Sequence, residues 1–440
     1  MVKHVILSVF FLSGSLFPMD PGIFKERREA VQDLLGPHSA LVVFTADVFN
    51  RNGDVNHEYR PHSDFWYLTG HPEPGAILLL VSDAFTALDQ VPFDGEIIFT
   101  LPRDPKLEVW TGKRLGLAGV KKNLGFSHST VPDSFDTILD RMLPYIDTLY
   151  VNQGSSSRHA VPSVTSDKLE KVDLDGVEVL DSGLLIHPLR HVKSDEELRL
   201  MKEAIYITGE GLKEGMMRTR PGANEANIEA AIEYTFRDLG SERLGFPSIV
   251  ASGPNTTILH YTDNNRQLER GDLLLMDVGA EYHMYTADVT RTIPVSGRFS
   301  PEQQELYTYL LNAQQVTFDS VRVGRTLKDL NRVARDYLMT TGFGEYFIHG
   351  VSHWLGLDVH DVGGRTGKIV EGSVFTIEPG IYIAEDDTTA PERYRGIGIR
   401  IEDDVLMTPE GPVWLSGSIP KEIRDVEHLM RIRSRRLRGR

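Results

Sequence analysis

The residues best suited to chemistry in this sequence are acids that follow apolar runs. Asp277 ends the run at 273–276, and a second acid, Asp288, comes eleven residues later in a segment rich in strand-forming residues. If residues 279–284 turn the chain, the two segments form a hairpin that brings both carboxylates to one face. Because a buried carboxylate is costly unless it is paired or bound to a cation, the pair predicts a carboxyl dyad or half of a cation site. An exposed acid at a strand edge is the alternative for either residue alone.

The same pattern recurs downstream, beside a cluster of histidines. Three histidines fall within 12 residues, namely His349, His353 and His360. Glu378 then ends an apolar run ahead of a Pro-Gly turn, and Glu402 ends another. A core histidine or a solvated acid explains any one of these residues, but the whole set favours one or two hard divalent cations. Four carboxylates carry more negative charge than one dication normally gathers, so two cations bridged by carboxylates fit better.

This set of residues resembles the metal ligands of the pita-bread metallopeptidases. The sequence around it is similar to the Xaa-Pro aminopeptidase (aminopeptidase P) branch, and the resemblance extends from about residue 24 to residue 430 without a departure at any ligand position. The resemblance implies two divalent metal ions, with Mn²⁺ as the first choice. The implied ligands are Asp277, Asp288, His353, Glu378 and Glu402.

The resemblance also assigns a place to each ligand. Asp288 and Glu402 would bridge the two ions, Asp277 would hold one of them, and His353 with Glu378 would hold the other. Such a pair lowers the pKa of a bound water and polarises a carbonyl, so the expected reaction is amide hydrolysis by a hydroxide that bridges the metals. Glu378 is the candidate proton shuttle.

Further residues are expected to act on the substrate or on the ligands. His360 could donate to the developing oxyanion, while His349 and His260 match the family's other active-site histidines. Arg400 lies two residues before the last ligand, so it should face the same way and pair with a ligand carboxylate. Tyr382 is a candidate for the pocket wall. A structural ion pair and core packing are the alternatives for Arg400 and Tyr382.

The function that the resemblance implies is hydrolysis of the N-terminal Xaa-Pro bond of peptides with proline second. Proline lacks an N–H and has a fixed φ, so this bond needs a specialised site. A prolidase that cleaves Xaa-Pro dipeptides is the alternative. The sequence at 350–354 looks more like that of aminopeptidase P, and no basic element is evident that would hold a proline carboxylate. A non-catalytic pita-bread binding protein is less favoured, because such proteins lose ligands.

Two domains are expected to carry this site. Residues 20–187 alternate strands and helices and predict an α/β domain of the aminopeptidase P N-terminal type. Residues 193–430 open with a capping box at Ser194 and Glu197 and predict an α+β catalytic domain. The resemblance adds that this second domain is a curved antiparallel sheet backed by helices, built from two similar halves.

Composition and the chain ends set further bounds. A net charge of −16 argues against a general nucleic-acid binder, and the absence of cysteine excludes disulfides, thiolate sites and a Cys nucleophile. Residues 1–18 fit either a secretory signal peptide or an extension upstream of Met19; we predict a cytoplasmic protein without stable membrane insertion, with export as the alternative. Residues 431–440 hold six arginines and predict a frayed basic tail. The first domain groups no site residues, so a homo-oligomer, dimer or tetramer, is expected through it.

Overall fold

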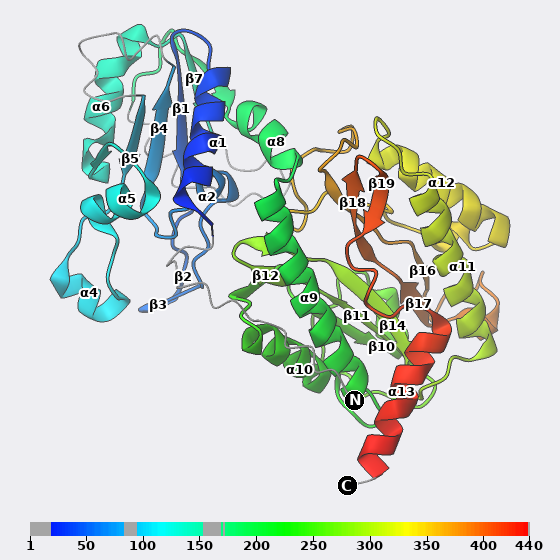
Figure 1. Ribbon diagram of the computed structural model, residues 1–440. Helices are drawn as coiled ribbons and strands as arrows, with labels where there is room; N and C mark the ends of the chain where they lie inside the picture. The colour runs from blue at the N-terminus through cyan, green and yellow to red at the C-terminus, as the bar shows by residue number, and fades with distance from the viewer. Residues whose placement is uncertain (1–18, 83–94, 153–168, 170–171, 439–440) are drawn as a thin grey trace, which may run out of the picture. The chain divides into compact units, whose positions relative to one another are not determined.

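The computed structural model describes residues 19–82, 95–152, 169 and 172–438 (Figure 1). The chain divides into two compact units, Met1–Ile186 and His187–Arg440. The prediction made for residues 1–18 lies outside the described residues. Within the described ranges, no helix is both long enough and apolar enough to cross a membrane.

The first unit is built around a mixed six-stranded sheet. Its strand order is β6-β5-β4-β1-β7-β8, with β1 antiparallel to β4 and parallel to β7. The sheet is almost fully buried in its centre, as expected for a sheet with helices packed against it. The strands of the unit are β1 (Ser39–Phe44), β2 (Asn50–Asn52), β3 (Val55–Asn56), β4 (Ile77–Val81), β5 (Glu96–Phe99), β6 (Ser129–Thr130), β7 (Thr148–Val151) and β8 (Glu178–Asp181). Its helices are α1 (Pro21–Leu34), α2 (Ser63–Thr69), α4 (Pro105–Thr111), α5 (Gly116–Leu124), α6 (Phe135–Met142) and α8 (Gly183–His191), the last of which runs into the second unit.

A buried histidine makes this unit sensitive to acid. The Nδ1 atom of His71 accepts the backbone N–H of Glu73 at 3.1 Å, so the proton of the ring lies on Nε2, which donates to Thr100 Oγ1 at 2.9 Å. Protonating Nδ1 would break the first of these bonds inside the core. Burial therefore lowers the pKa of His71 from 6.5 to about 4.

We expect this histidine to destabilise the fold as the pH falls. Its folded pKa lies below its unfolded value, so the stability it contributes is complete above pH 6.5 and is lost as the pH falls toward about 4. Relative to the non-titrating His71→Gln variant, the wild type should lose about 2 kcal/mol of unfolding free energy between pH 7 and pH 5. Denaturant unfolding of both proteins at the two pH values measures this loss; identical pH dependence would contradict it.

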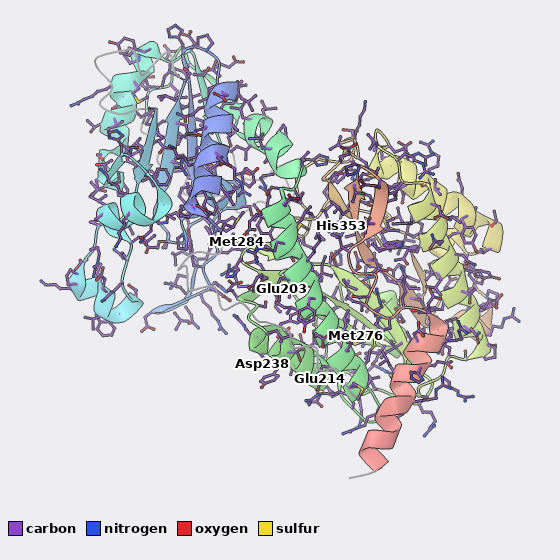
Figure 2. The ribbon with its side chains drawn as sticks, viewed as in Figure 1. Glu203, Glu214, Asp238, Met276, Met284 and His353 are labelled. Carbon is purple, nitrogen blue, oxygen red and sulfur yellow. The ribbon has the colours of Figure 1, made fainter. Side chains whose placement is uncertain are left out.

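The second unit consists of two halves with matching content. In the first half, helices α9 (Asp195–Arg218) and α10 (Glu225–Asp238) accompany the antiparallel sheet β10-β11-β14, made of Ile249–Ser252, Leu273–Val278 and Val289–Pro294. Gly215 allows α9 to lie close to this sheet, since a Cβ there would meet the Sδ of Met276 at 2.9 Å (Figure 2). A small sheet of β9 (Arg243–Leu244), β12 (Ala280–Tyr282) and β13 (Tyr285–Thr286) extends this half.

The second half repeats this plan with other strands. Helices α11 (Pro301–Asp319) and α12 (Leu327–Thr341) accompany β15-β18-β19, and β16 pairs with β17. Every strand pairing of this unit is antiparallel within the described residues, and one hydrophobic core runs through both halves. The α+β class predicted for this unit is confirmed. The strands are β15 (Val374–Ile377), β16 (Gly380–Ile383), β17 (Ile397–Arg400), β18 (Asp403–Thr408) and β19 (Gly411–Trp414).

The prediction of a frayed basic tail is wrong as far as Arg438. Helix α13 (Ile423–Arg438) continues through most of the arginine-rich segment. Val426 and Met430 lie in the core of the second unit and fix the first turns of this helix. Because arginine is a good helix former, the remaining residues can extend a helix that is already anchored.

Candidate metal centre and active site

The first two candidate ligands come from the predicted hairpin, which the structure contains in a longer form. Strand β11 pairs with β14, and Asp277 lies opposite Thr290. Between them the chain leaves the sheet at Gly279, where a Cβ would lie 1.9 Å from the carbonyl oxygen of Ala287, and returns after the short β12–β13 hairpin. Glycine is therefore required at this exit, and the two acids face one cavity.

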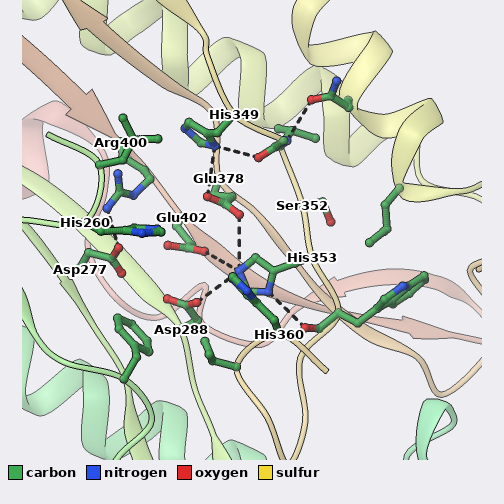
Figure 3. Close-up of a pocket in the computed structure, with 18 of the residues that line it drawn as sticks. His260, Asp277, Asp288, His349, Ser352, His353, His360, Glu378, Arg400 and Glu402 are labelled. Atoms are coloured by element: carbon green, nitrogen blue, oxygen red, sulfur yellow. Dashed lines mark hydrogen bonds and ion pairs between the residues drawn. The ribbon is translucent and has the colours of Figure 1, made fainter. Parts of the chain in front are cut away.

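Three of the acids lie next to strand ends. Asp288 precedes β14, Glu378 follows β15, and Glu402 separates β17 from β18. All of them line a cavity of about 1050 Å³ together with Asp277 and His353. Figure 3 shows the carboxylates of Asp288, Glu378 and Glu402 converging on His353. The two halves of the unit thus contribute two acids each.

The imidazole of His353 is oriented so that Nε2 faces this group. Its Nδ1 lies 3.1 Å from the carbonyl oxygen of Trp354, which can only accept, so Nδ1 is the donor of that hydrogen bond. Its Nε2 lies 3.3, 3.5 and 3.8 Å from oxygens of Asp288, Glu378 and Glu402. The hydrogen bond at Nδ1 thus fixes the ring so that Nε2 could share a bound cation with the three carboxylates.

Unsatisfied oxygens and shifted pKa values point to the same need for positive charge. Oδ1 of Asp277 and Oδ1 of Asp288 are buried without a hydrogen-bond partner among the described residues. Burial, followed by the charge of Glu402, raises the pKa of Asp288 and that of Glu378 well above their usual values. Burial, followed by the charge of Asp277, raises the pKa of Glu402 to about 7. The donor set therefore fits divalent metal ions, and Asp288, His353 and Glu402 have ligand atoms within 4.8 Å of one another.

A chain of hydrogen bonds borders the carboxylates on one side. Arg400 Nη2 pairs with Asp277 Oδ2 at 2.5 Å, and its Nη1 donates to the hydroxyl of Tyr382 at 2.8 Å. That hydroxyl donates to Nε2 of His349 at 2.9 Å, and Nδ1 of His349 donates to the carbonyl oxygen of Gly350 at 2.8 Å. Because guanidinium can only donate, the direction of every bond is fixed. Both nitrogens of His349 are engaged, so its ring is held in one orientation where it lines the cavity.

The remaining histidines line the cavity with fewer constraints. The rings of His353 and His360 meet edge to face with centroids 4.3 Å apart. Burial, and then the neighbouring charges of His353 and His260, lower the pKa of His360 to about 4, so it is neutral near pH 7. His260 lies on the loop after η3 (Gly253–Thr257) and also lines the cavity. Sequence analysis therefore named residues that the fold gathers around one cavity.

Two threonines at the site escaped the sequence analysis. Thr290 Oγ1 donates to Glu402 Oε2 at 2.7 Å and accepts Arg400 Nε at 3.1 Å. Thr376 Oγ1 accepts the backbone N–H of His353 at 3.2 Å and lies 3.4 Å from an oxygen of Glu378. Each threonine lies two residues from an acid of the set, which is the spacing of one strand face, so a signal for both was present.

The sequence analysis also missed two basic residues that line the cavity. Lys328 and Arg365 line it as well, although the sequence offered no evident basic element for a carboxylate. The argument against a dipeptidase that rested on that absence therefore does not hold.

Comparison with known proteins agrees with this site. A model of metallopeptidase family M24 matches residues 199–409, and a model of the aminopeptidase P N-terminal domain matches residues 24–150. The Xaa-Pro aminopeptidases of Haemophilus influenzae and Escherichia coli are 39% and 35% identical to this chain; each alignment spans 92% of the chain and 96% and 97%, respectively, of the relative. The structure of Escherichia coli aminopeptidase P with the inhibitor Pro-Leu matches with a TM-score of 0.85 at 34% identity, covering 95% of this chain and 99% of that one.

The fold and the converging carboxylates define a metallopeptidase with the pita-bread architecture. The chain belongs to metallopeptidase family M24, in its Xaa-Pro aminopeptidase (aminopeptidase P) branch. It is a metal-dependent exopeptidase that acts on peptides, which confirms the enzyme class and rules out the binding-protein alternative. A need for divalent metal ions follows from the family and from the donor set.

Proposed function

We propose that this enzyme removes the first residue from peptides of three or more residues that have proline second. The observation that carries the proposal is the placement of His349 and Arg400 in the cavity wall beside the carboxylates, both hydrogen-bonded to the buried hydroxyl of Tyr382. The fixed ring of His349 suits a proline ring, while the acids suit the free amino group of the residue before it. The names of the relatives support the same substrate class.

Two divalent ions, with Mn²⁺ as the native metal, form part of this proposal; they would be held by Asp277, Asp288, His353, Glu378 and Glu402. When bound, such ions polarise the scissile carbonyl and make water more acidic. Their charge also compensates the four carboxylates, whose mutual repulsion is expressed in the raised pKa of Asp288.

The chain's own residues would then handle protons and orientation. Glu378 accepts a proton at a carboxylate oxygen and returns it to the proline nitrogen as the amide bond breaks. Neutral His360 donates an N–H to the carbonyl oxygen as it gains negative charge. His260, on the loop after η3, contacts the substrate. Arg400 holds Asp277 in place through their ion pair.

Peptide length is the direct test of this function. With added Mn²⁺, an Ala-Pro-Xaa tripeptide should be hydrolysed at its first bond at least about tenfold faster than the dipeptide Ala-Pro, because the residue after proline adds binding energy that the dipeptide lacks. Chromatographic quantification of released alanine measures both rates. An Ala-Ala-Xaa peptide serves as the control for the proline pocket. Faster turnover of the dipeptide would assign the protein to the prolidases.

Self-association through the first unit is also proposed. Helix α4 has no buried residue, and it exposes 48% of Leu107, 82% of Val109 and 86% of Trp110. An apolar group this exposed is typical of a contact surface, and tryptophan is enriched at such contacts. A homodimer or homotetramer that covers this helix would remove the group from water.

We expect Trp110→Glu to weaken that assembly. Sedimentation of the wild type at micromolar concentration should give a multiple of 49.4 kDa, whereas the variant should shift toward the monomer. Tyr234→Glu is the matched control, because Tyr234 is another aromatic residue that is 68% exposed, and it lies in the second unit. A wild type that sediments only as a monomer would rule out the proposal. A cytoplasmic location stays a prediction, and the intact mass of the mature protein would show whether residues 1–18 are removed, as the alternative of export requires.

A further inference from the structure

Glu225 is a fully buried carboxylate that the site described above does not use. It is the first residue of α10, and its side chain is inaccessible to solvent. Taking a carboxylate out of water is costly, and the described contacts of this one are with neutral donors. Such a group persists only where hydrogen bonds replace its water, and these bonds show what it holds in place.

Five donors meet the two oxygens of Glu225. Oε1 accepts the N–H of Ser252 at 2.6 Å, its hydroxyl at 2.7 Å and the amide of Asn255 at 3.3 Å. Oε2 accepts the hydroxyl of Tyr261 at 2.8 Å and the backbone N–H of Arg266 at 2.8 Å. The carboxylate therefore ties the start, the middle and the end of the loop that carries His260.

That loop is fixed on its other sides as well. The ring of Tyr261 packs against Ile249 on β10 and against Leu275 on β11, the strand that carries Asp277. The hydroxyl of Thr256 accepts the backbone N–H of Gly398 at 2.9 Å, two residues before Arg400. His260, by contrast, is itself exposed in the cavity, and no hydrogen bond of its ring occurs among the described residues. The placement of this ring follows from the backbone of the loop.

We infer that Glu225 is a positioning residue for His260, which it holds against the substrate by fixing residues 252–266. This inference rests on the proposed contact between His260 and the substrate. A carboxylate is needed because five donors converge on two oxygens. In Glu225→Gln, an amide nitrogen must replace one oxygen, and next to the N–H of Arg266 it can accept no hydrogen bond.

The test is a double-mutant cycle between these two residues on the Mn²⁺-loaded enzyme. Glu225→Gln should lower kcat/KM for the tripeptide by about tenfold to a hundredfold, since a displacement near 1 Å can cost that much. In the His260→Ala background the same substitution should have almost no effect. Tyr261→Phe, which removes one of the five bonds, should give a smaller loss that also disappears without His260.

Hydrogen exchange supplies a readout that does not depend on catalysis. In the metal-free protein, Glu225→Gln should speed amide exchange at Ser252 and Arg266, with no change in α12. Glu233→Gln is the matched control: this acid lies on the same helix and binds Ser248 Oγ at 2.8 Å. It should leave both exchange and kcat/KM within about twofold of wild type.

The outcomes separate the two proposals. A loss of equal size in the His260→Ala background, or native exchange in the loop of Glu225→Gln, would overturn the positioning role. Full activity of His260→Ala would instead remove His260 from the proposed function. Any loss of kcat/KM in Glu225→Gln would then act through other residues, so this outcome overturns the positioning role as well. If Glu225→Gln fails to fold, the cycle with Tyr261→Phe decides.

Discussion

Replacing Asp288 with alanine should remove most of the bound metal and nearly all hydrolysis, by a factor on the order of 10³ or more. Asp288 Oδ2 lies 3.3 Å from Nε2 of His353, and Oδ1 has no partner among the residues that the structure describes. Elemental analysis after dialysis, together with the tripeptide assay, measures both effects.

The loss should not come from a damaged fold. Because burial and the neighbouring carboxylates raise the pKa of Asp288, removing its charge relieves repulsion in the metal-free protein, whose melting temperature should not fall. Added Mn²⁺ should stabilise the wild type, by about 4 kcal/mol at a thousandfold excess over Kd, and the variant far less. Asp386→Ala, a change of an exposed acid after β16, is the control. Activity that survives thorough chelation with no metal bound would contradict the metal centre itself.

The ligand positions could be predicted because local pattern determines them. An apolar run buries a strand, and an acid at its end is then forced toward the interior, which is how Asp277 and Glu378 were found. Caps were equally local: Ser194 and Glu197 form the predicted capping box at the start of α9. Helix α12 has local signals at both ends as well, because Thr326 caps its start and Gly342 ends it in a left-handed conformation. Local sequence signals of this kind can be recognised without knowledge of the fold.

What could not be predicted depends on contacts between distant parts of the chain. The bond from Thr290 to Glu402 joins residues 112 positions apart. Arg400 was expected to pair with a ligand carboxylate, but its partner, Asp277, lies 123 positions away and could not be named from the sequence. In the sequence, Glu225 is indistinguishable from an ordinary acidic residue in the first turn of a helix. Its burial becomes evident only when the loop at 252–266 folds over it. The helical tail was missed for the same reason, since Met430 anchors it to a core that the sequence does not display.

Changing Glu378 to glutamine should separate metal binding from proton transfer. The substitution keeps the shape and one oxygen for the metal but cannot take up a proton, so turnover should fall by roughly 10²- to 10⁴-fold while much of the metal stays bound. The position of the carboxylate supports both roles. Oε1 lies 3.5 Å from His353 Nε2 among the ligands, and Oε2 lies 3.5 Å from His349 Nδ1 on the substrate side. One oxygen thus lies among the proposed metal ligands, while the other lies beside His349, which is proposed to contact the substrate.

The comparison of kcat with KM distinguishes this role from that of a simple ligand. Loss of proton transfer lowers kcat with little change in KM, whereas loss of a metal ligand lowers the metal content first and can be offset by excess Mn²⁺. Glu385→Gln, the same substitution at an exposed position seven residues further on, should change neither quantity. Undiminished turnover in Glu378→Gln with a full complement of metal would remove Glu378 from proton transfer. The proton would then have to reach the proline nitrogen by way of His360 or His260, the cavity histidines that make no hydrogen bond to another described residue.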